Sequence, residues 1–203
     1  MRKRIMFAAA LGVAFGLGVA SALADDSGSY YVSAGGGVSL LPDLHLNTAG
    51  GTAHEGFGTG YVAGGTVGYN YGDGWRFELT SLYQHSELSR IDGAPANGHL
   101  QSTSVMANAT YDLLPNPMLT PYVGVGVGVQ DISARADGFS GRGWSPAYQA
   151  EAGLRHDLTE QASLFGEYRF SQAESVSLND GPDIARQHFS DHALMAGLSF
   201  KLN

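Results

Sequence analysis

The sequence predicts an all-β fold: one eight-stranded antiparallel β-barrel that crosses a membrane, preceded by a cleavable signal peptide. Three observations support this prediction. The chain of 203 residues begins with an export signal, eight later segments alternate apolar and polar residues with a period of two, and the connections between these segments alternate between short and long. Each segment has about ten residues, which is the length that a tilted strand needs to cross a bilayer.

The first 24 residues have the layout of a secretory signal peptide. Basic residues at 2–4 precede an apolar run over 5–19, and the small-residue sequence "ALA" at 22–24 precedes two aspartates. The alternative is a transmembrane helix, because the run is long for a signal peptide. The cleavage pattern favours the signal peptide. We therefore expect residues 1–24 to be removed and residues 25–203 to form a single barrel domain.

The exported part of the chain is acidic and lacks cysteine. The signal segment contains three basic residues and no acidic ones, which leaves 8 Lys and Arg against 19 Asp and Glu, a formal charge of −11. This balance argues against nucleic acid or anionic lipid headgroups as the main partner. The absence of cysteine excludes disulfides, and no later apolar run is long enough for a membrane helix.

Eight segments show strand-like alternation, with small or polar residues on one face and apolar residues on the other. They cover residues 30–40, 60–72, 75–84, 102–113, 121–130, 147–158, 163–170 and 192–202. In "PYVGVGVGVQ" at 121–130, valine and glycine alternate almost without interruption. A phosphate-binding loop is the alternative for this stretch, but no helix and no "GKS" or "GKT" follows it.

The connections indicate how the strands sit in the membrane. Short turns are expected at 72–74, 114–120 and 158–162, and long loops at 41–59, 86–101, 131–146 and 172–190. Short turns on one side and long loops on the other are typical of outer-membrane barrels. An even number of strands returns both termini to the short-turn side, the periplasm.

The polar face carries charges of both signs, and we interpret it as the lumen. We expect six of these side chains to form a buried ionic network: Arg76, Glu78, Glu151, Arg155, Glu167 and Arg169. Unpaired charges in a narrow lumen would be costly, and glycines opposite them would provide the space that long side chains need. The alternative is a soluble β-sandwich or lipocalin-like barrel with its apolar face inside.

Aromatic residues lie near the ends of the segments, as expected for girdles at the two membrane interfaces. They are Tyr30, Tyr31, Tyr61, Tyr69, Tyr71, Trp75, Tyr83, Tyr111, Tyr122, Tyr148, Phe170 and Phe200.

Residues that could carry chemistry are few. The seven histidines (His45, His54, His85, His99, His156, His188 and His192) lack the spacing of metal ligands, so we expect no metal and no cofactor. The sequence "HFSDH" at 188–192 is similar to the His-x-Ser element of outer-membrane lipid A deacylases, in which serine is the nucleophile. The rest of that family's pattern is absent.

The ordered set of strands resembles the small OmpA-like or Opa-like outer-membrane β-barrel family, often called porin family proteins. The resemblance rests on "GTVGYNYGDGWRFELTSLYQ", "NATYDL", "TPYVGVGVGV", "YQAEAGLRHDL", "LFGEYRF" and "ALMAGLSFKLN". The last segment resembles the C-terminal signal read by the barrel-assembly machinery, here Gly197, Leu198, Phe200 and Leu202. Asn203 at the end departs from the family's terminal aromatic residue.

The resemblance implies a monomeric, non-enzymatic protein of the bacterial outer membrane with both termini in the periplasm. Its partners would be outer-membrane lipid and lipopolysaccharide, the assembly machinery, and a host or surface ligand that contacts the loops as a surface antigen. Eight strands enclose too little space for a wide pore. Two alternatives remain open: a narrow porin-like channel for small solutes, and a lipid A-modifying hydrolase at the rim.

Overall fold

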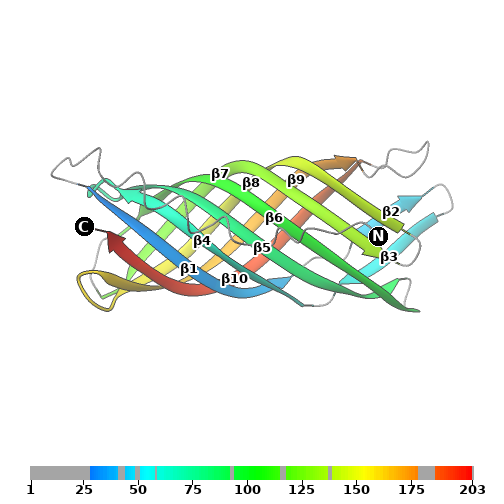
Figure 1. Cartoon of the computed structure of the whole chain (residues 1–203), viewed down its shortest axis with the longest axis horizontal. Helices are drawn as coiled ribbons and strands as arrows, with labels where there is room; N and C mark the ends of the chain where they lie inside the picture. The colour runs from blue at the N-terminus through cyan, green and yellow to red at the C-terminus, as the bar shows by residue number, and fades with distance from the viewer. Residues whose placement is uncertain are drawn as a thin grey trace, which may run out of the picture.

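The computed structural model describes residues 28–40, 44–48, 51–57, 59–91, 94–114, 118–136, 139–177 and 186–202, and the expected signal peptide lies outside them. These residues form ten strand segments (Figure 1). They are β1 (Ser29–Leu40), β2 (Leu44–Thr48), β3 (Gly51–Phe57), β4 (Gly60–Asn70), β5 (Trp75–Ile91), β6 (Ala94–Asp112), β7 (Thr120–Ala136), β8 (Phe139–Asp157), β9 (Ala162–Ser177) and β10 (Arg186–Leu202). In this part of the chain, no helix is long and apolar enough to span a membrane.

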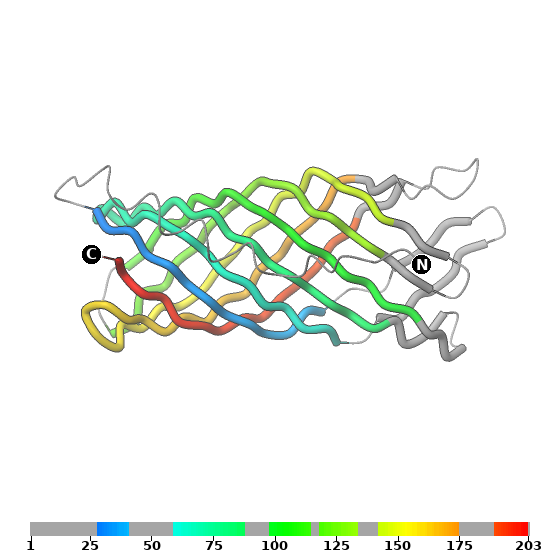
Figure 2. Tube along the Cα trace, viewed as in Figure 1, coloured from blue at the N-terminus to red at the C-terminus, as the bar shows by residue number. Residues whose placement is uncertain are grey.

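Eight of these strands close into an antiparallel barrel, which confirms the predicted fold. The strand order β5-β4-β1-β10-β9-β8-β7-β6 is closed by pairing between β5 and β6. Hydrogen-bonded partners followed around the barrel from Tyr30 return to β1 at Leu40, a stagger of ten residues. This stagger makes the strands wind steeply around the axis (Figure 2). An eight-stranded barrel has an interior that side chains can fill.

The connections at one end of the barrel are short, and we call this end the turn end. Its described connecting residues are 71–74, 113–114, 118–119 and 158–161, and the C-terminal end of β10 lies there beside the start of β1 (Figure 1). The predicted "GDG" turn has positive φ values of 82° at Gly72 and 96° at Gly74, a conformation that glycine adopts without steric cost. The Asn70 side chain accepts a hydrogen bond from the Gly72 amide at 2.8 Å.

The opposite end, which we call the hairpin end, differs from the prediction of four long loops. Residues 86–101 and 131–146 are largely paired strand, with Glu87 opposite His99 and Ser133 opposite Arg142. Residues 41–59 contain the hairpin of β2 and β3, and β3 pairs with the end of β5. Residues 172–190 also include the ends of β9 and β10. The apolar–polar alternation does not predict these extensions, because a strand that has no lipid-facing side does not need apolar residues on either face.

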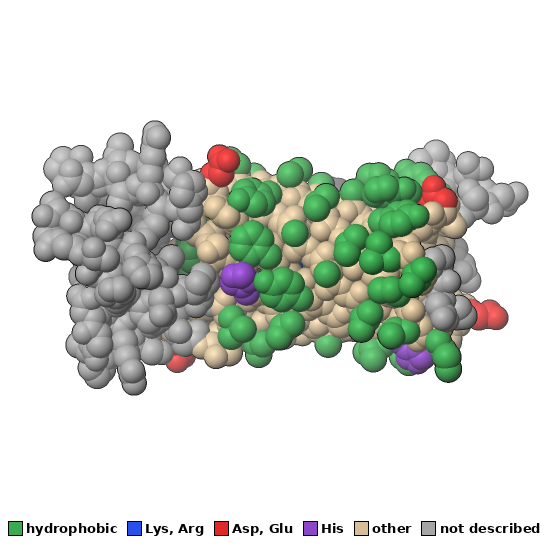
Figure 3. Space-filling model, turned by 180° about the vertical axis from the view of Figure 1, so that it is seen from behind, with side chains coloured by type: hydrophobic (Ala, Val, Ile, Leu, Met, Phe, Trp, Pro, Cys, Tyr) green, Lys and Arg blue, Asp and Glu red, His purple; other side chains and the backbone are tan. Residues whose placement is uncertain are grey.

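The faces of the barrel are arranged as predicted, with apolar side chains outside. On β7, the side chains of Val125 and Val127 are 64% and 68% exposed on the outer surface. Buried polar side chains line the interior, among them Asn108, Gln130 and Gln149. In a soluble barrel these faces would be reversed. Apolar side chains cover the outer surface, and the acidic side chains in view lie near the two ends (Figure 3).

Candidate functional site: the charged lumen

The six side chains expected to form an ionic network all point into the turn-end half of the lumen. They come from three strands: β5 carries Arg76 and Glu78, β8 carries Glu151 and Arg155, and β9 carries Glu167 and Arg169. Strand alternation places each pair on one face, and barrel closure brings the three strands around a common space.

The first group of ion pairs connects β5, β6 and β8. Arg76 lies 3.1 Å from Glu78 and 3.1 Å from Asp112, and Arg155 lies 2.8 Å from the other oxygen of Asp112. Arg155 is also 3.7 Å from Asp157 at the rim. Asp112 thus bridges two arginines from different strands. The sequence places Asp112 on the polar face of its segment, but nothing local indicates that it would meet both arginines.

The second group connects β8 and β9. Nη2 of Arg169 lies 2.8 Å from Glu151 and 2.6 Å from Glu167, and all three side chains are at least nine-tenths buried. Glu151 also accepts a hydrogen bond from the Thr110 hydroxyl at 3.1 Å. Buried charges need such partners, because moving a charge out of water costs several kcal/mol. Removing one partner of a buried ion pair lowers stability by about 3–5 kcal/mol.

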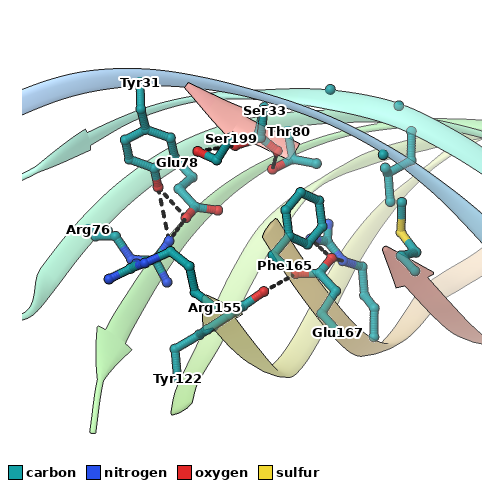
Figure 4. Close-up of a pocket in the computed structure, with 17 residues that line it drawn as sticks. Tyr31, Ser33, Arg76, Glu78, Thr80, Tyr122, Arg155, Phe165, Glu167 and Ser199 are labelled. Atoms are coloured by element: carbon teal, nitrogen blue, oxygen red, sulfur yellow. Dashed lines mark hydrogen bonds and ion pairs between the residues drawn. The ribbon is translucent and has the colours of Figure 1, made fainter. Parts of the chain in front are cut away.

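Two tyrosines join the groups, and the prediction placed both wrongly. Tyr31 and Tyr122 were expected in the interfacial girdles, but they are 6% and 5% exposed and lie in the lumen. The Tyr31 hydroxyl donates to Glu78. The Tyr122 hydroxyl donates to Glu167 at 2.9 Å, while the Arg76 guanidinium lies 4.8 Å from the centre of its ring. Figure 4 shows Tyr31 pointing toward Arg76 and Glu78, and Tyr122 reaching toward Glu167.

Neutral side chains continue the network across the barrel. Gln149 donates to Asn108, Asn108 donates to Thr80 at 2.9 Å, and the Thr80 hydroxyl lies 2.9 Å from that of Thr66. This row crosses from β8 through β6 and β5 to β4. Its last two members, Thr80 and Thr66, line a small cavity together with charged side chains of both groups and with Phe165 (Figure 4).

Glycines provide the space for the largest lumen side chains. Tyr122 is the cross-strand partner of Gly153, and a Cβ there would lie 2.6 Å from the Tyr122 hydroxyl oxygen. Glu151 is the partner of Gly124, where a Cβ would lie 2.7 Å from its carboxylate. Real Cβ atoms do not approach other atoms so closely. A larger residue at Gly124 or Gly153 would displace the lumen side chain that lies against that strand, so glycine fits these two positions.

The hairpin-end half of the lumen is chemically different. Val62, Leu82, Ala193 and Met195 form one apolar cluster. A second cluster consists of Met106, Ile132, Ala147, Ala173 and Phe189. The one ionisable side chain described in this half is Asp191, which is 1% exposed and accepts hydrogen bonds from neutral groups, the Ser39 hydroxyl at 2.6 Å and the Gln84 amide.

The "HFSDH" segment does not assemble a catalytic group from its described side chains. Asp191 points into the lumen, whereas His192 lies on the outer face, where its Nδ1 is 2.6 Å from the Tyr168 hydroxyl. Strand alternation places Ser190 on the face opposite Asp191. The side chains of His188, His45 and His54 lie outside the described residues. Among the described residues, no three acidic or histidine side chains are grouped closely enough to hold a metal ion.

The predicted assembly signal lies on β10 at the turn end. Leu198, Phe200 and Leu202 are 41%, 48% and 37% exposed on the outer face, and Gly197 faces inward. Their role in assembly remains a prediction.

Comparison with known proteins identifies the family. The model of the outer membrane protein beta-barrel domain matches residues 7–201. The chain belongs to this family. It is 29% identical over 184 residues to an outer membrane protein of Gluconacetobacter diazotrophicus, a match that covers 75% of this chain and 48% of that relative. The chain therefore spans about half the length of that relative. It is 26% identical over 198 residues to a Brucella suis protein, covering 71% of this chain and 68% of the relative.

Solved structures share the fold. Neisserial surface protein A superposes with a TM-score of 0.58 at 20% identity, covering 86% of this chain and 99% of that one. The outer membrane protein OprG of Pseudomonas aeruginosa superposes with a TM-score of 0.56 at 15% identity, covering 86% and 96%. The family and the fold place this protein in the bacterial outer membrane.

Proposed function

We propose that this protein is a closed, non-enzymatic barrel of the outer membrane that strengthens the envelope and presents its hairpin end to the outside for surface contacts. The observation that carries the proposal is the filled lumen. Ion pairs and tyrosines occupy its turn-end half, and two apolar clusters occupy much of the other half. A solute would have to displace both, so no wide pore is expected.

Planar-bilayer recording tests whether the lumen conducts. The purified barrel is inserted into bilayers beside a general porin, which serves as the positive control for insertion and recording. We expect no reproducible single-channel openings from this protein. Regular openings of constant conductance would contradict the closed barrel and support the alternative of a narrow porin-like channel.

The hydrolase alternative loses support from the position of Asp191, whose carboxylate accepts hydrogen bonds from the Ser39 and Gln84 side chains in the lumen, while the His192 imidazole lies on the outer face beside Tyr168. Lipid analysis of cells that produce the protein or its Ser190→Ala variant tests the non-enzymatic part of the proposal. We expect the same lipid A acylation pattern in both. A change that depends on Ser190 would establish a rim enzyme instead.

The hairpin end is the surface that we propose for contact with a host or surface ligand. Its described residues are largely hydrogen-bonded strand, so strand pairing can hold a contact surface in place. Replacing the segments 88–97 and 134–141 with short turns should abolish surface binding while the barrel still migrates as a heat-modifiable band. Binding that survives both replacements would contradict this assignment.

The proposal also includes a monomeric barrel, its orientation in the membrane and its assembly signal. The turn end, with both ends of the described barrel, faces the periplasm, as short turns do in outer-membrane barrels. The barrel-assembly machinery recognises the outer face of β10 through Leu198, Phe200 and Leu202. Phe200→Ala should lower the amount of folded barrel in the membrane, and the matched variant Leu164→Ala on β9 should not. Equal amounts would argue against this signal.

A further inference from the structure

The outer surface of the barrel carries two aromatic belts that differ in composition. The turn-end belt consists of Tyr30, Tyr69, Tyr71, Trp75, Phe77 and Tyr111, whose rings contact one another with centroids 4.7–5.6 Å apart. The hairpin-end belt consists of Tyr61, Tyr83, His85, His99, Tyr168, Phe170 and His192. Aromatic belts mark the levels of the lipid headgroups.

Histidine is concentrated in the hairpin-end belt. Among the histidines with described side chains, His85, His99 and His192 belong to it, and each has its ring against another ring of the belt. His156 lies at the turn end, where its Nδ1 contacts the backbone carbonyl oxygen of Met118. Both levels carry tyrosines, but three of the four histidines with described side chains lie at the hairpin end.

The neighbours of His85 define the densest part of this belt. Its ring centroid lies 5.3 Å from that of Tyr61 on β4 and 5.9 Å from that of His99 on β6, with which it is stacked. The Gln101 amide is 3.4 Å from its Nδ1.

The titratable groups around this stack are few. On β5 they are Tyr83 and the exposed Glu87, which is a cross-strand partner of His99, and on β4 the neighbour is Tyr61. On β7, Arg135 is the other cross-strand partner of His99. The imidazoles are partly exposed, so they are accessible at the level of the headgroups.

We propose that His85 and His99, with the side chain of Gln101, form a binding site for the phosphate group of an anionic glycolipid in the outer leaflet. Imidazole gains a proton between about pH 5 and 8 and then donates two hydrogen bonds from a positive charge. Phosphate oxygens accept such bonds strongly. The site is continuous with the lipid-facing surface, because Tyr61 and Tyr83 beside it are exposed on the outer face.

The inference rests on the orientation proposed above, in which the hairpin end faces outward. Binding to purified protein does not depend on that orientation, whereas proteolysis of intact cells does. If the hairpin end is cleaved only after the outer membrane is permeabilised, the orientation fails while the binding site can still be measured. The two proposals are therefore separable.

The test is titration of the folded, full-length barrel in detergent with bis-phosphorylated lipid A, followed by native mass spectrometry at pH 5.5 and pH 7.5. We expect the wild-type protein to bind about tenfold more tightly at pH 5.5, the effect of about one charge-assisted hydrogen bond. The His85→Gln/His99→Gln variant should lose this gain. His156→Gln, at the opposite belt, should retain it.

Three comparisons keep the result specific. Dephosphorylated lipid A should show no gain at the lower pH, and inorganic phosphate at the lipid concentration should not compete, because the lipid chains hold the headgroup at the barrel surface. His85→Arg, which carries a permanent charge, should bind tightly at both pH values. An unchanged pH gain in the double variant, or an equal gain with dephosphorylated lipid, would overturn the proposal. Heat-modifiable migration verifies that each variant is folded.

Discussion

The two halves of the lumen fill the same narrow space in different ways. In the turn-end half, three arginines pair with four buried carboxylates, and three of these ion pairs join different strands. In the hairpin-end half, apolar clusters surround neutral polar side chains and Asp191. A closed barrel can thus be filled by an ionic core or by an ordinary protein core, but the two respond differently to the loss of one side chain.

The largest effect is expected where glycine leaves room for the ionic half. A Cβ at Gly126 would collide with the Asn108 side chain and lie 3.0 Å from Gln149, so Gly126→Leu should prevent formation of the folded barrel. Heat-modifiable migration on a detergent gel measures this. The matched control is Val125→Leu, because the Val125 side chain is 64% exposed to lipid. A folded Gly126→Leu barrel would show that the lumen has spare volume.

Breaking the ionic half should have the next largest effect. Arg169→Met would leave Glu151 and Glu167 without their cation, which should lower the free energy of unfolding by about 3–5 kcal/mol. Urea unfolding in detergent measures the change. Adding Glu151→Gln to this variant should recover part of the loss, because one uncompensated charge is removed. A loss similar to that of a single neutral hydrogen bond would contradict an ionic core.

Truncation in the hairpin-end half should cost less. Leu82→Ala removes a side chain that is 6% exposed and packs in the apolar cluster with Val62 and Met195. Loss of a buried leucine lowers stability by about 2–4 kcal/mol, depending on how far the cavity closes. The same urea titration applies, with Leu79→Ala on the lipid face as control. If both variants lose equally, the cluster does not act as a core.

The smallest effect is expected at the isolated carboxylate. Asp191→Asn keeps an acceptor for the Ser39 hydroxyl and loses no ion pair, so the change in unfolding free energy should be about 1 kcal/mol or less. Asp112→Asn removes the charge that two arginines share and should cost more. If both substitutions lower the free energy of unfolding equally at the same pH, the two halves of the lumen do not differ in how they depend on charge.

Much of the barrel could be predicted from the sequence, because the membrane imposes a simple rule on each strand. Lipid on one side and a crowded lumen on the other force the alternation seen in 121–130, where the valines face outward and the glycines inward. This alternation is required only in strand segments that face lipid on one side. Residues 86–101 and 131–146 extend the paired strands at the hairpin end, and the alternation did not predict that they are strand.

The site could be predicted only in part. The six charged residues were recognisable because they share a face with their neighbours, yet Asp112, Tyr31 and Tyr122 were missed as members of the network. An aromatic residue near a strand end fits a girdle or a lumen equally well by position. The face of the strand on which the residue lies distinguishes the two positions, and both tyrosines lie on the lumen face of their strands.

The sequence by itself determined the number of barrel strands and the face that meets the lipid, because these depend on local composition and a period of two, while the export signal stays a prediction. Only the tertiary structure decided which charges meet. The ten-residue stagger around the barrel sets Arg76 beside Asp112 and Arg169 beside Glu151. That stagger arises from closure of all eight strands together, and no single segment of the chain contains it.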